Sequence, residues 1–337
     1  MSKVSLSAVA FLVVVAGVPC AAQDPSAAPA TLAASQPPTA YAPGPAGPIF
    51  KTGVDVVALT VTVTDAQRKY INNLGAQDFQ VFEDGIQQPV SFFGVADVPL
   101  DVALLVDGSA SMLDTLPLVR DAANGLLRTL RPQDRASLVE FRNTVRVSQS
   151  LTTDIPRVVA AINGITASGG TSLYNALYVT LKDFQKEAGI DTGVRRRTIV
   201  VLSDGEDTGS LIGFDEVLDL ARRSGVTIYT VALKSESQLL RQRAQQNGRR
   251  YFSQADYSMR ALADETGARA FFPDQAADLK AIYDTVAAEL AAQYALGYVS
   301  RNPVRNGAFR RLVVRLTTLP GTRPRTRTGY FADATRR

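Results

Sequence analysis

The chain of 337 residues contains no histidine and one cysteine, Cys20. Without histidine it lacks the commonest general base, the Ser-His-Asp and Cys-His nucleophile systems, and the usual nitrogen ligand of zinc. One cysteine cannot form a disulfide within the chain, so stability must come from a packed core and from any bound metal. Apolar residues make up 46% of the sequence and charged residues 20%, which is ordinary for a protein with such a core. These absences disfavour most catalytic classes.

The first 22 residues have the pattern of a secretory signal peptide. Lys3 gives a positive start, Val4 to Val18 is mostly apolar, and small residues allow cleavage after Ala22. A membrane anchor is the alternative, but this run is shorter than the roughly 20 residues that a spanning helix needs. A lipid anchor at Cys20 is disfavoured because Pro19 stands where a lipoprotein signal has a small residue. We therefore expect a secreted, periplasmic or cell-surface protein with no transmembrane span after cleavage.

Arginine is concentrated at the C-terminus. Residues 293–337 contain ten arginines and one acid, Asp333, whereas the whole chain has a net charge of only +4. Such a segment could contact an anionic surface, or it could be a solvated strand face followed by a frayed tail, which is the interpretation favoured here. No basic motif interleaved with aromatic residues is present, so no nucleic-acid partner is expected.

The N-terminal and C-terminal portions are predicted to be β. After an Ala- and Pro-rich linker at 23–50, residues 55–65 alternate between apolar and polar side chains, as in a strand buried on one face. Asp84-Gly85 between the runs 79–83 and 86–93 indicates a hairpin. Beyond Gln293, strands are expected at 294–299, 312–316 and 325–331, with Tyr294 and Tyr298 in the core.

The middle of the chain is predicted to be α/β. Continuous apolar runs at 101–106, 197–202 and 226–233 fit parallel strands covered on both faces. In the segments between and after these runs, apolar residues recur at helical spacing. The predicted helices are 115–130, 154–162, 173–187, 214–224 and 276–292. We expect this domain, 98–292, to be inserted in a β-sandwich-like domain formed by 51–97 and 293–332. Residues 235–256 are expected to be a mobile, polar surface loop.

Three polar segments are expected to meet at one edge of the sheet. Asp107-Gly108-Ser109-Ala110-Ser111 and Ser203-Asp204-Gly205-Glu206-Asp207 each follow an apolar run, and Gly169-Gly170-Thr171-Ser172 precedes a helix. In open α/β sheets, ligands bind at the carboxyl ends of the strands. All the candidate ligands are oxygen donors, which suit a hard cation such as Mg²⁺, Mn²⁺ or Ca²⁺. They are Asp107, Ser109, Ser111, Thr171 and Asp204. Glu206 and Asp207 are expected to be solvated loop acids.

These segments resemble the metal-ion-dependent adhesion site (MIDAS) of von Willebrand factor type A (vWA) domains. Asp107, Ser109 and Ser111 match its Asp-x-Ser-x-Ser element, Thr171 its second loop and Asp204 its third. The resemblance implies a Rossmann-like, mainly parallel sheet with helices on both faces. It also implies that the serines and threonine bind Mg²⁺ directly, that the aspartates act directly or through water, and that a partner's Asp or Glu completes the shell.

The whole chain also resembles bacterial secreted proteins labelled VWFA-related. The shared features are the pattern from Asp78-Phe79 to Phe92-Phe93, the segment 264–267 and the closing Gly329-Tyr330-Phe331. The resemblance implies an exported, metal-dependent protein-binding or adhesion module and no enzyme. One alternative is a structural component of an envelope or secretion assembly with a stabilising metal. A metal-assisted hydrolase, with Asp107 or Asp204 activating water, is disfavoured because a second metal centre, a histidine and a nucleophile with an adjacent base are missing.

Overall fold

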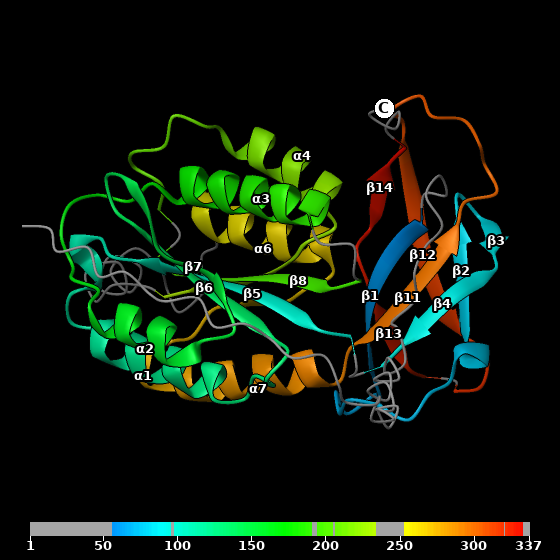
Figure 1. Cartoon of the computed structure of the whole chain (residues 1–337), viewed down its shortest axis with the longest axis horizontal. Coiled ribbons are helices and arrows are strands. Elements are labelled where there is room, and N and C mark those ends of the chain that lie inside the picture. The colour runs from blue at the N-terminus through cyan, green and yellow to red at the C-terminus, as the bar shows by residue number, and fades with distance from the viewer. Residues whose placement is uncertain are drawn as a thin grey trace, which may run out of the picture. The chain divides into compact units, whose positions relative to one another are not determined.

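The computed structural model (Figure 1) describes residues 56–95, 98–190, 194–204, 206–233, 253–319 and 321–332. They all belong to one compact unit, Ala46–Arg337. The predicted signal peptide with Cys20, the predicted linker and most of the segment 235–256 lie outside the described residues. None of the described helices is both long and apolar enough to cross a membrane.

A six-stranded sheet forms the centre of the α/β part, in the order β10-β9-β8-β5-β6-β7. Neighbouring strands are parallel except β7, which pairs antiparallel with β6. The strands are β5 Leu100–Asp107, β6 Arg135–Phe141, β7 Val145–Thr152, β8 Arg196–Ser203, β9 Thr227–Ala232 and β10 Ala270–Phe271. The mainly parallel sheet is confirmed, whereas the β6–β7 hairpin is a feature that the apolar runs do not predict.

Helices cover both faces of this sheet (Figure 1), with α1, α2 and α7 on one face and α3, α4 and α6 on the other. The helices are α1 Leu116–Leu127, α2 Ile155–Asn163, α3 Leu173–Ile190, α4 Phe214–Ser224, α6 Gln254–Thr266 and α7 Leu279–Ala291. Single turns of 3₁₀ helix are η1 Ala76–Asp78, η2 Ala110–Met112 and η3 Ala276–Asp278. The five predicted helices are confirmed, with η3 forming the first turn of the predicted segment 276–292.

The side chains of β5 show why its sequence is a continuous apolar run. Val102, Leu104 and Val106 pack against α1, α2 and α7. Ala103 and Leu105 pack into the second core, against α3, α4 and α6. All eight residues of β5 are buried. A strand covered on both faces has no side that favours polar residues.

Helix α6 begins inside the segment expected to be a mobile loop. The Oγ of Ser253 accepts a hydrogen bond from Asp256 N at 3.1 Å, and the carboxylate of Asp256 accepts one from Ser253 N at 3.0 Å. This capping box starts the helix, so the loop expectation is wrong for residues 253–256. The helix ends at Gly267, whose φ of +80° is left-handed and whose hydrogens face the backbone of Thr326 and Arg327.

Two four-stranded sheets form the β part, β13-β1-β11-β4 and β14-β12-β2-β3. The strands are β1 Val56–Thr64, β2 Phe79–Glu83, β3 Ile86–Gln88, β4 Val90–Gly94, β11 Tyr294–Val299, β12 Phe309–Leu316, β13 Arg323–Arg325 and β14 Gly329–Phe331. Strand β1 pairs with β11, and β2 pairs with β12. Each sheet thus combines strands from before and after the α/β part. Tyr294 and Tyr298 are buried in the core between the sheets.

Two predicted strands are each divided between the two sheets. The hairpin turn at Asp84-Gly85 is confirmed, since β2 pairs with β3 and both turn residues have positive φ. The predicted strand 86–93, however, breaks at Pro89, which has no N–H to donate to a sheet. Likewise, the predicted strand 325–331 is two short strands, β13 and β14, which pair with β1 and β12 respectively.

The buried side chain of Arg196 ties together the two chain connections between the α/β and β parts. Its guanidinium donates to Val98 O at 3.3 Å, on the connection leading into β5. It also donates to Leu290 O at 2.7 Å, in the last turn of α7, and to Gln293 Oε1 at 3.2 Å, directly before β11. Burial, together with the nearby charge of Arg131, lowers the pKa of Arg196 to about 10.

Glu289, near the end of α7, is the buried acid at which the two parts meet. Its side chain is fully buried. It accepts hydrogen bonds from Tyr229 on β9 at 2.5 Å, from Tyr70 at 3.1 Å and from Thr62 on β1 at 3.4 Å. Arg325 on β13 completes the set with an ion pair. Since a buried carboxylate is stable only when it is hydrogen-bonded or paired, these contacts fix α7 against the β part.

Candidate functional site

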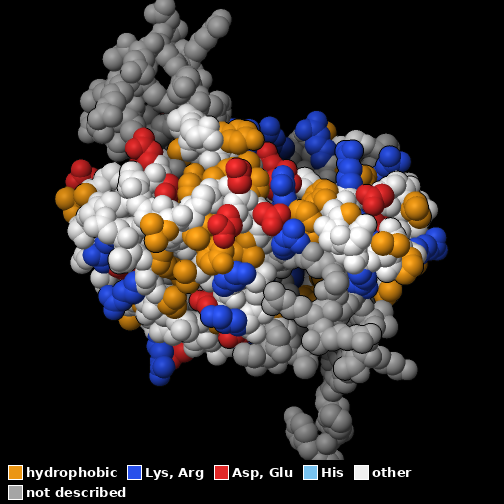
Figure 2. All heavy atoms as spheres, turned by 90° about the horizontal axis from the view of Figure 1, so that it is seen from above, with side chains coloured by type: hydrophobic (Ala, Val, Ile, Leu, Met, Phe, Trp, Pro, Cys, Tyr) orange, Lys and Arg blue, Asp and Glu red, His pale blue; other side chains and the backbone are white. Residues whose placement is uncertain are grey.

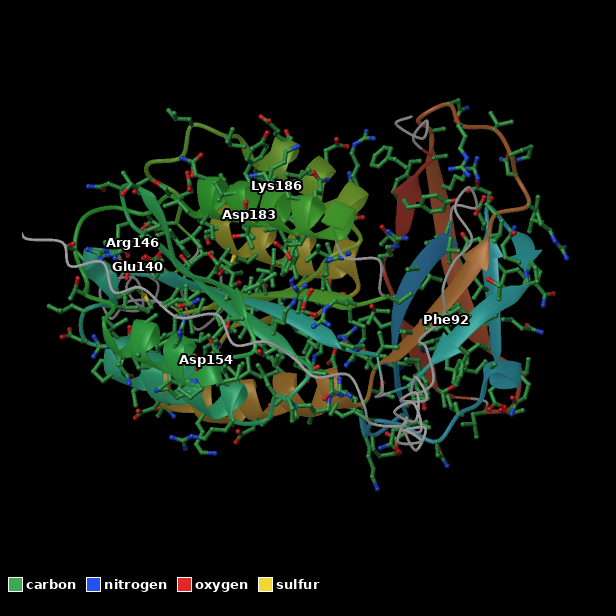
Figure 3. The ribbon with its side chains drawn as sticks, viewed as in Figure 1. Phe92, Glu140, Arg146, Asp154, Asp183 and Lys186 are labelled. Carbon is green, nitrogen blue, oxygen red and sulfur yellow. The ribbon has the colours of Figure 1, made fainter. Side chains whose placement is uncertain are left out.

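The candidate residues gather where β5 and β8 end. These strands are parallel neighbours, with Val106 paired with Leu202. Asp107 is therefore the last residue of β5, Ser203 the last of β8, and Asp204 follows directly. In Figure 3, the labels Glu140 and Arg146 lie at this carboxyl edge of the sheet. Glu140 is near the end of β6, and Arg146 pairs with it from β7.

Asp107 is held in one orientation by two hydrogen bonds. Its Oδ1 accepts from Ser109 N at 2.8 Å, and its Oδ2 accepts from the Ser203 hydroxyl at 2.6 Å. The carboxyl group is completely buried. Burial raises the pKa of Asp107, and the hydrogen bonds from Ser109 and Ser203 offset only part of this effect.

Asp204 is linked to both serines of the first segment through hydroxyl groups. The Ser111 Oγ donates to Asp204 Oδ2 at 2.9 Å, and the Oγ atoms of Ser109 and Ser111 are 3.0 Å apart. Glu206 N donates to the other oxygen of Asp204 at 3.1 Å. Burial, followed by the negative charge of Asp107, raises the pKa of Asp204 to about 6. Two carboxylates therefore destabilise one another's charge at this edge.

Thr171 lies on a loop that hydrogen bonds fasten to the first segment. Ala110 N donates to Gly169 O at 3.0 Å, and Ser168 N donates to Gly108 O at 2.8 Å. Gly169 has a φ of +76°, a left-handed conformation that glycine adopts without strain. Thr171 is itself nearly fully buried. The loop therefore meets the first segment at the edge where Asp107 lies.

Thr208 joins the Thr171 loop to the third segment. Thr171 N donates to Thr208 Oγ1 at 3.0 Å, and Thr208 N and Gly209 N both donate to Thr171 O at 2.9 Å. The structure thus links Ser109, Ser111 and Asp204 through their side chains. It joins the Asp107 carboxylate to the backbone N of Ser109, and it links Thr171 through the Thr171 backbone.

Several residues that organise these loops are not evident from the sequence. Asp207, expected to be a solvated acid, instead accepts hydrogen bonds from Tyr174 N at the start of α3 and from Ser210 Oγ, at 3.2 and 2.7 Å. Glu206 is exposed, as expected. Asn143, in the β6–β7 turn, accepts from Gly170 N at 2.6 Å. Ser203 precedes a candidate ligand, but nothing in its sequence position indicates that it binds Asp107.

Arg142 places a positive charge beside the first segment. Its guanidinium pairs with Glu140 and donates to Ser168 Oγ at 3.1 Å. A Cβ on Gly108 would lie 3.1 Å from Arg142 Nε and 3.2 Å from Thr166 O. Glycine at 108 therefore allows this close approach.

The donor set fits a hard divalent cation. It combines two buried carboxylates with three hydroxyl groups, and oxygen ligands of this kind suit Mg²⁺, Mn²⁺ and Ca²⁺. The described residues contain no group of three or more His, Cys, Asp and Glu side chains able to hold a metal, so hydroxyl groups must supply part of any shell. A divalent cation would offset the repulsion that raises the pKa of Asp204.

Comparison with known proteins identifies the α/β part. Residues 101–266 match the sequence profile of the von Willebrand factor type A domain. Among solved structures, the chain resembles a von Willebrand factor type A protein from Catenulispora acidiphila (11% identity, TM-score 0.48, covering 82% of this chain and 73% of that one). It also resembles the vWF domain of the type V pili tip protein Mfa5 from Porphyromonas gingivalis (15%, 0.43, 57% and 94%). A third is proximal thread matrix protein 1 from the mussel byssus, with a zinc-occupied MIDAS motif (16%, 0.48, 63% and 50%). The profile match and the helix-covered parallel sheet show that residues 101–266 are a von Willebrand factor type A domain.

Proposed function

We propose that this chain is an exported, metal-dependent protein-binding module. A divalent cation held by Asp107, Ser109, Ser111, Thr171 and Asp204 would accept a carboxylate from a partner protein. The observation that carries the proposal is the run of contacts from Asp204 through the hydroxyls of Ser111 and Ser109, beside the buried Asp107.

The residues have separate roles in this proposal. Asp107 already accepts from Ser109 N and Ser203 Oγ, so it orients the first segment and supplies negative charge. The hydroxyls of Ser109, Ser111 and Thr171 supply neutral lone pairs. Asp204 Oδ2 accepts a hydrogen bond from the Ser111 hydroxyl, and a cation would compete for that carboxylate oxygen.

Mg²⁺ is the cation that this set favours. Mg²⁺ requires six oxygen ligands in a small octahedron, and short serine and threonine side chains suit that geometry. When bound, the cation supplies an electrophilic position for an anionic oxygen. The two carboxylates of Asp107 and Asp204 would balance the charge of the cation without making the site negative. The cation would therefore still attract the carboxylate of a partner's Asp or Glu.

Export places the module where such a partner can be met. The proposal puts the mature chain in the periplasm, at the cell surface or outside the cell, on the basis of the positive start, apolar run and small residues of 1–22. A vWA domain commonly serves as a protein-interaction module, and binding rather than catalysis is proposed here.

The first test is the effect of Mg²⁺ on stability. A cation that binds only the folded state should stabilise it by about 2.7 kcal/mol at 100 times its Kd. Asp107→Ala and Asp204→Ala should abolish the rise in Tm that Mg²⁺ produces. Asp215→Ala, at an exposed acid in the first turn of α4, should keep it. Equal responses in all three variants would exclude the proposed metal site.

The second test separates binding from a purely structural metal. Immobilised mature chain is exposed to native envelope and culture medium, with Mg²⁺ or with EDTA, and the retained proteins are identified. A specific protein retained only with Mg²⁺, and lost with Asp107→Ala, supports the proposal. A rise in Tm with Mg²⁺ but no metal-dependent retention would instead support a structural component.

A further inference from the structure

At one end of the β part, the β11–β12 loop lies against the turn between β2 and β3. The Ser300 hydroxyl donates to Glu83 Oε1 at 2.7 Å. Arg301 donates from its backbone N to Gln88 Oε1 at 3.0 Å and from its guanidinium to Gln87 O at 3.2 Å. We call the side chains exposed there the β-tip surface, and they are Ile86, Arg301, Val304, Arg305 and Arg311.

The β-tip surface combines apolar and basic side chains. Ile86 and Val304 are 59% and 53% exposed, more than any other large apolar side chain described in the β part. Figure 2 shows Lys and Arg side chains gathered over the β part, on the right, among hydrophobic side chains and with few acids. These two exposed apolar side chains, set among charges of one sign, make this end a candidate interaction surface.

A buried ion pair fixes the loop that carries this surface. Arg310 is nearly fully buried and pairs with Glu83 at 2.8 Å. The same guanidinium donates to Ser300 Oγ at 2.8 Å and Asn302 O at 3.1 Å, and it contacts Val304 O. The loop therefore presents Val304 without having to order on binding, which lowers the entropic cost of association.

The surrounding sequence gives this end a positive charge. Residues 293–332 contain eight arginines and no acid. Arg310 and Arg325 pair with Glu83 and Glu289, and Arg327 donates to Ala58 O at 3.0 Å. The acid in the adjoining turn, Asp84, accepts from Arg311 N at 2.8 Å. Arg301 and Arg311 outweigh this one acid even before Arg305 is counted, so the β-tip surface carries a net positive charge.

We propose that the β-tip surface adsorbs to membranes that expose anionic lipid headgroups. Arginines would contact the phosphates while Ile86 and Val304 enter the boundary between headgroups and acyl chains, as apolar side chains do at membrane interfaces. The apolar side chains project from a loop and a turn, which favours a soft lipid boundary over an acidic protein. This proposal is independent of the metal site.

The test measures binding of the mature chain, from Gln23 on, to vesicles. The vesicles are phosphatidylcholine alone or with phosphatidylglycerol at 3:1. The chain should bind only the anionic vesicles, and less at high salt. Because each arginine near an anionic surface contributes about fivefold, R301Q/R305Q/R311Q should weaken binding roughly 100-fold. I86S/V304S should weaken it about tenfold.

The matched control removes three positive charges elsewhere on the chain. Arg157, Lys186 and Lys280 have exposed side chains on α2, α3 and α7, and R157Q/K186Q/K280Q should bind nearly as the wild type. Circular dichroism checks that every variant is folded. Absence of binding to anionic vesicles overturns the proposal, as does an equal loss in the control. Wild-type vesicle binding by I86S/V304S, with competition by soluble polyglutamate, would show a general polyanion site and also overturn it.

Discussion

The phenol of Tyr229, on β9, donates a 2.5 Å hydrogen bond to Glu289, near the end of α7. Gln293 donates to the same phenol oxygen at 3.0 Å. Both Tyr229 and Glu289 are fully buried. Through Thr62, Tyr70 and Arg325, the same carboxylate also reaches the β part. One acid therefore joins the central sheet, the last helix and the sandwich.

Glu289→Ala should lower the free energy of unfolding by about 3–5 kcal/mol, because it leaves the partly buried Arg325 and the buried hydroxyl of Tyr229 without their partner. Urea denaturation measures this change. Asp284→Ala, on the same helix, removes an exposed acid paired with Lys280 and should cost no more than about 0.5 kcal/mol. Similar losses in the two variants would contradict the assigned role of Glu289.

The contribution of Glu83 to stability should disappear in acid. Burial tends to raise the pKa of Glu83, but hydrogen bonds from Tyr298, Ser300, Tyr330 and Arg310 lower it below 4.5, its ordinary value. A lowered folded-state pKa gives stability that is present above 4.5 and lost as pH falls through the folded-state pKa. The difference in unfolding free energy between wild type and Glu83→Gln should therefore shrink below pH 4.5.

The control for this pH dependence is Glu216→Gln, at an exposed acid on α4. Its unfolding free energy should follow that of the wild type across the same range. A difference between wild type and Glu83→Gln that stays constant from neutral pH to pH 3 would rule out the predicted linkage.

Two glycines at helix ends should respond differently to alanine. Gly225 and Gly267 follow α4 and α6 with φ of +68° and +80°. A Cβ at 225 would meet the end of the Arg327 side chain at 3.3 Å, whereas one at 267 would lie 2.5 Å from the Thr326–Arg327 backbone. Both changes incur the left-handed cost of about 1–2 kcal/mol.

Gly267→Ala should cost about 1–3 kcal/mol more than Gly225→Ala, since backbone cannot move aside as a flexible side chain can. Thermal unfolding of the two variants measures the difference. Equal changes in Tm would contradict this prediction, since they would mean that the Thr326–Arg327 backbone moves away from a Cβ at position 267 at no cost.

Deleting residues 293–337 should unfold the strands at 56–95. The deletion removes β11 and β13 from both sides of β1 and removes β12 from β2, and the remaining strands are too few for a stable sandwich. Hydrogen exchange of the β1 amides should become fast. Deleting only 333–337 is the control and should leave exchange unchanged. Retained protection in the longer deletion would refute the predicted discontinuous domain.

The strands that the sequence predicts are those whose burial is uniform or strictly alternating. Strands β5, β8 and β9 are covered on both faces, and β1 buries its apolar positions on one face, with Thr62 the one polar residue also buried, so their apolar patterns are plain. In β6, the polar residues Ser137 and Glu140 interrupt the apolar run, although both are buried. Glu140 can be buried because it is paired with Arg142. In β7 no residue is fully buried, and its pairing with β6 contains two register shifts, so it lacks a pattern to detect.

The candidate ligands are predictable for a different reason. Asp107 and Asp204 follow apolar runs, and the topology of a parallel sheet brings such positions together. Residues that support them act through contacts between distant segments, and no local pattern marks those contacts. Ser203 reaches Asp107 across 96 positions, and Asp207 reaches Tyr174 N across 33.

The position of Arg196 determines how the chain would carry mechanical tension. Arg196 is the first residue of β8, so it holds the two connections together at the amino edge of the central sheet, whereas Asp107 and Asp204 lie at the carboxyl edge. A tethered partner pulling on the carboxyl edge would stretch β5 along its axis. The strain would arrive at Val98, where the guanidinium shares it with the end of α7. We therefore expect the two connections to resist extension together, because the Arg196 guanidinium bonds to both.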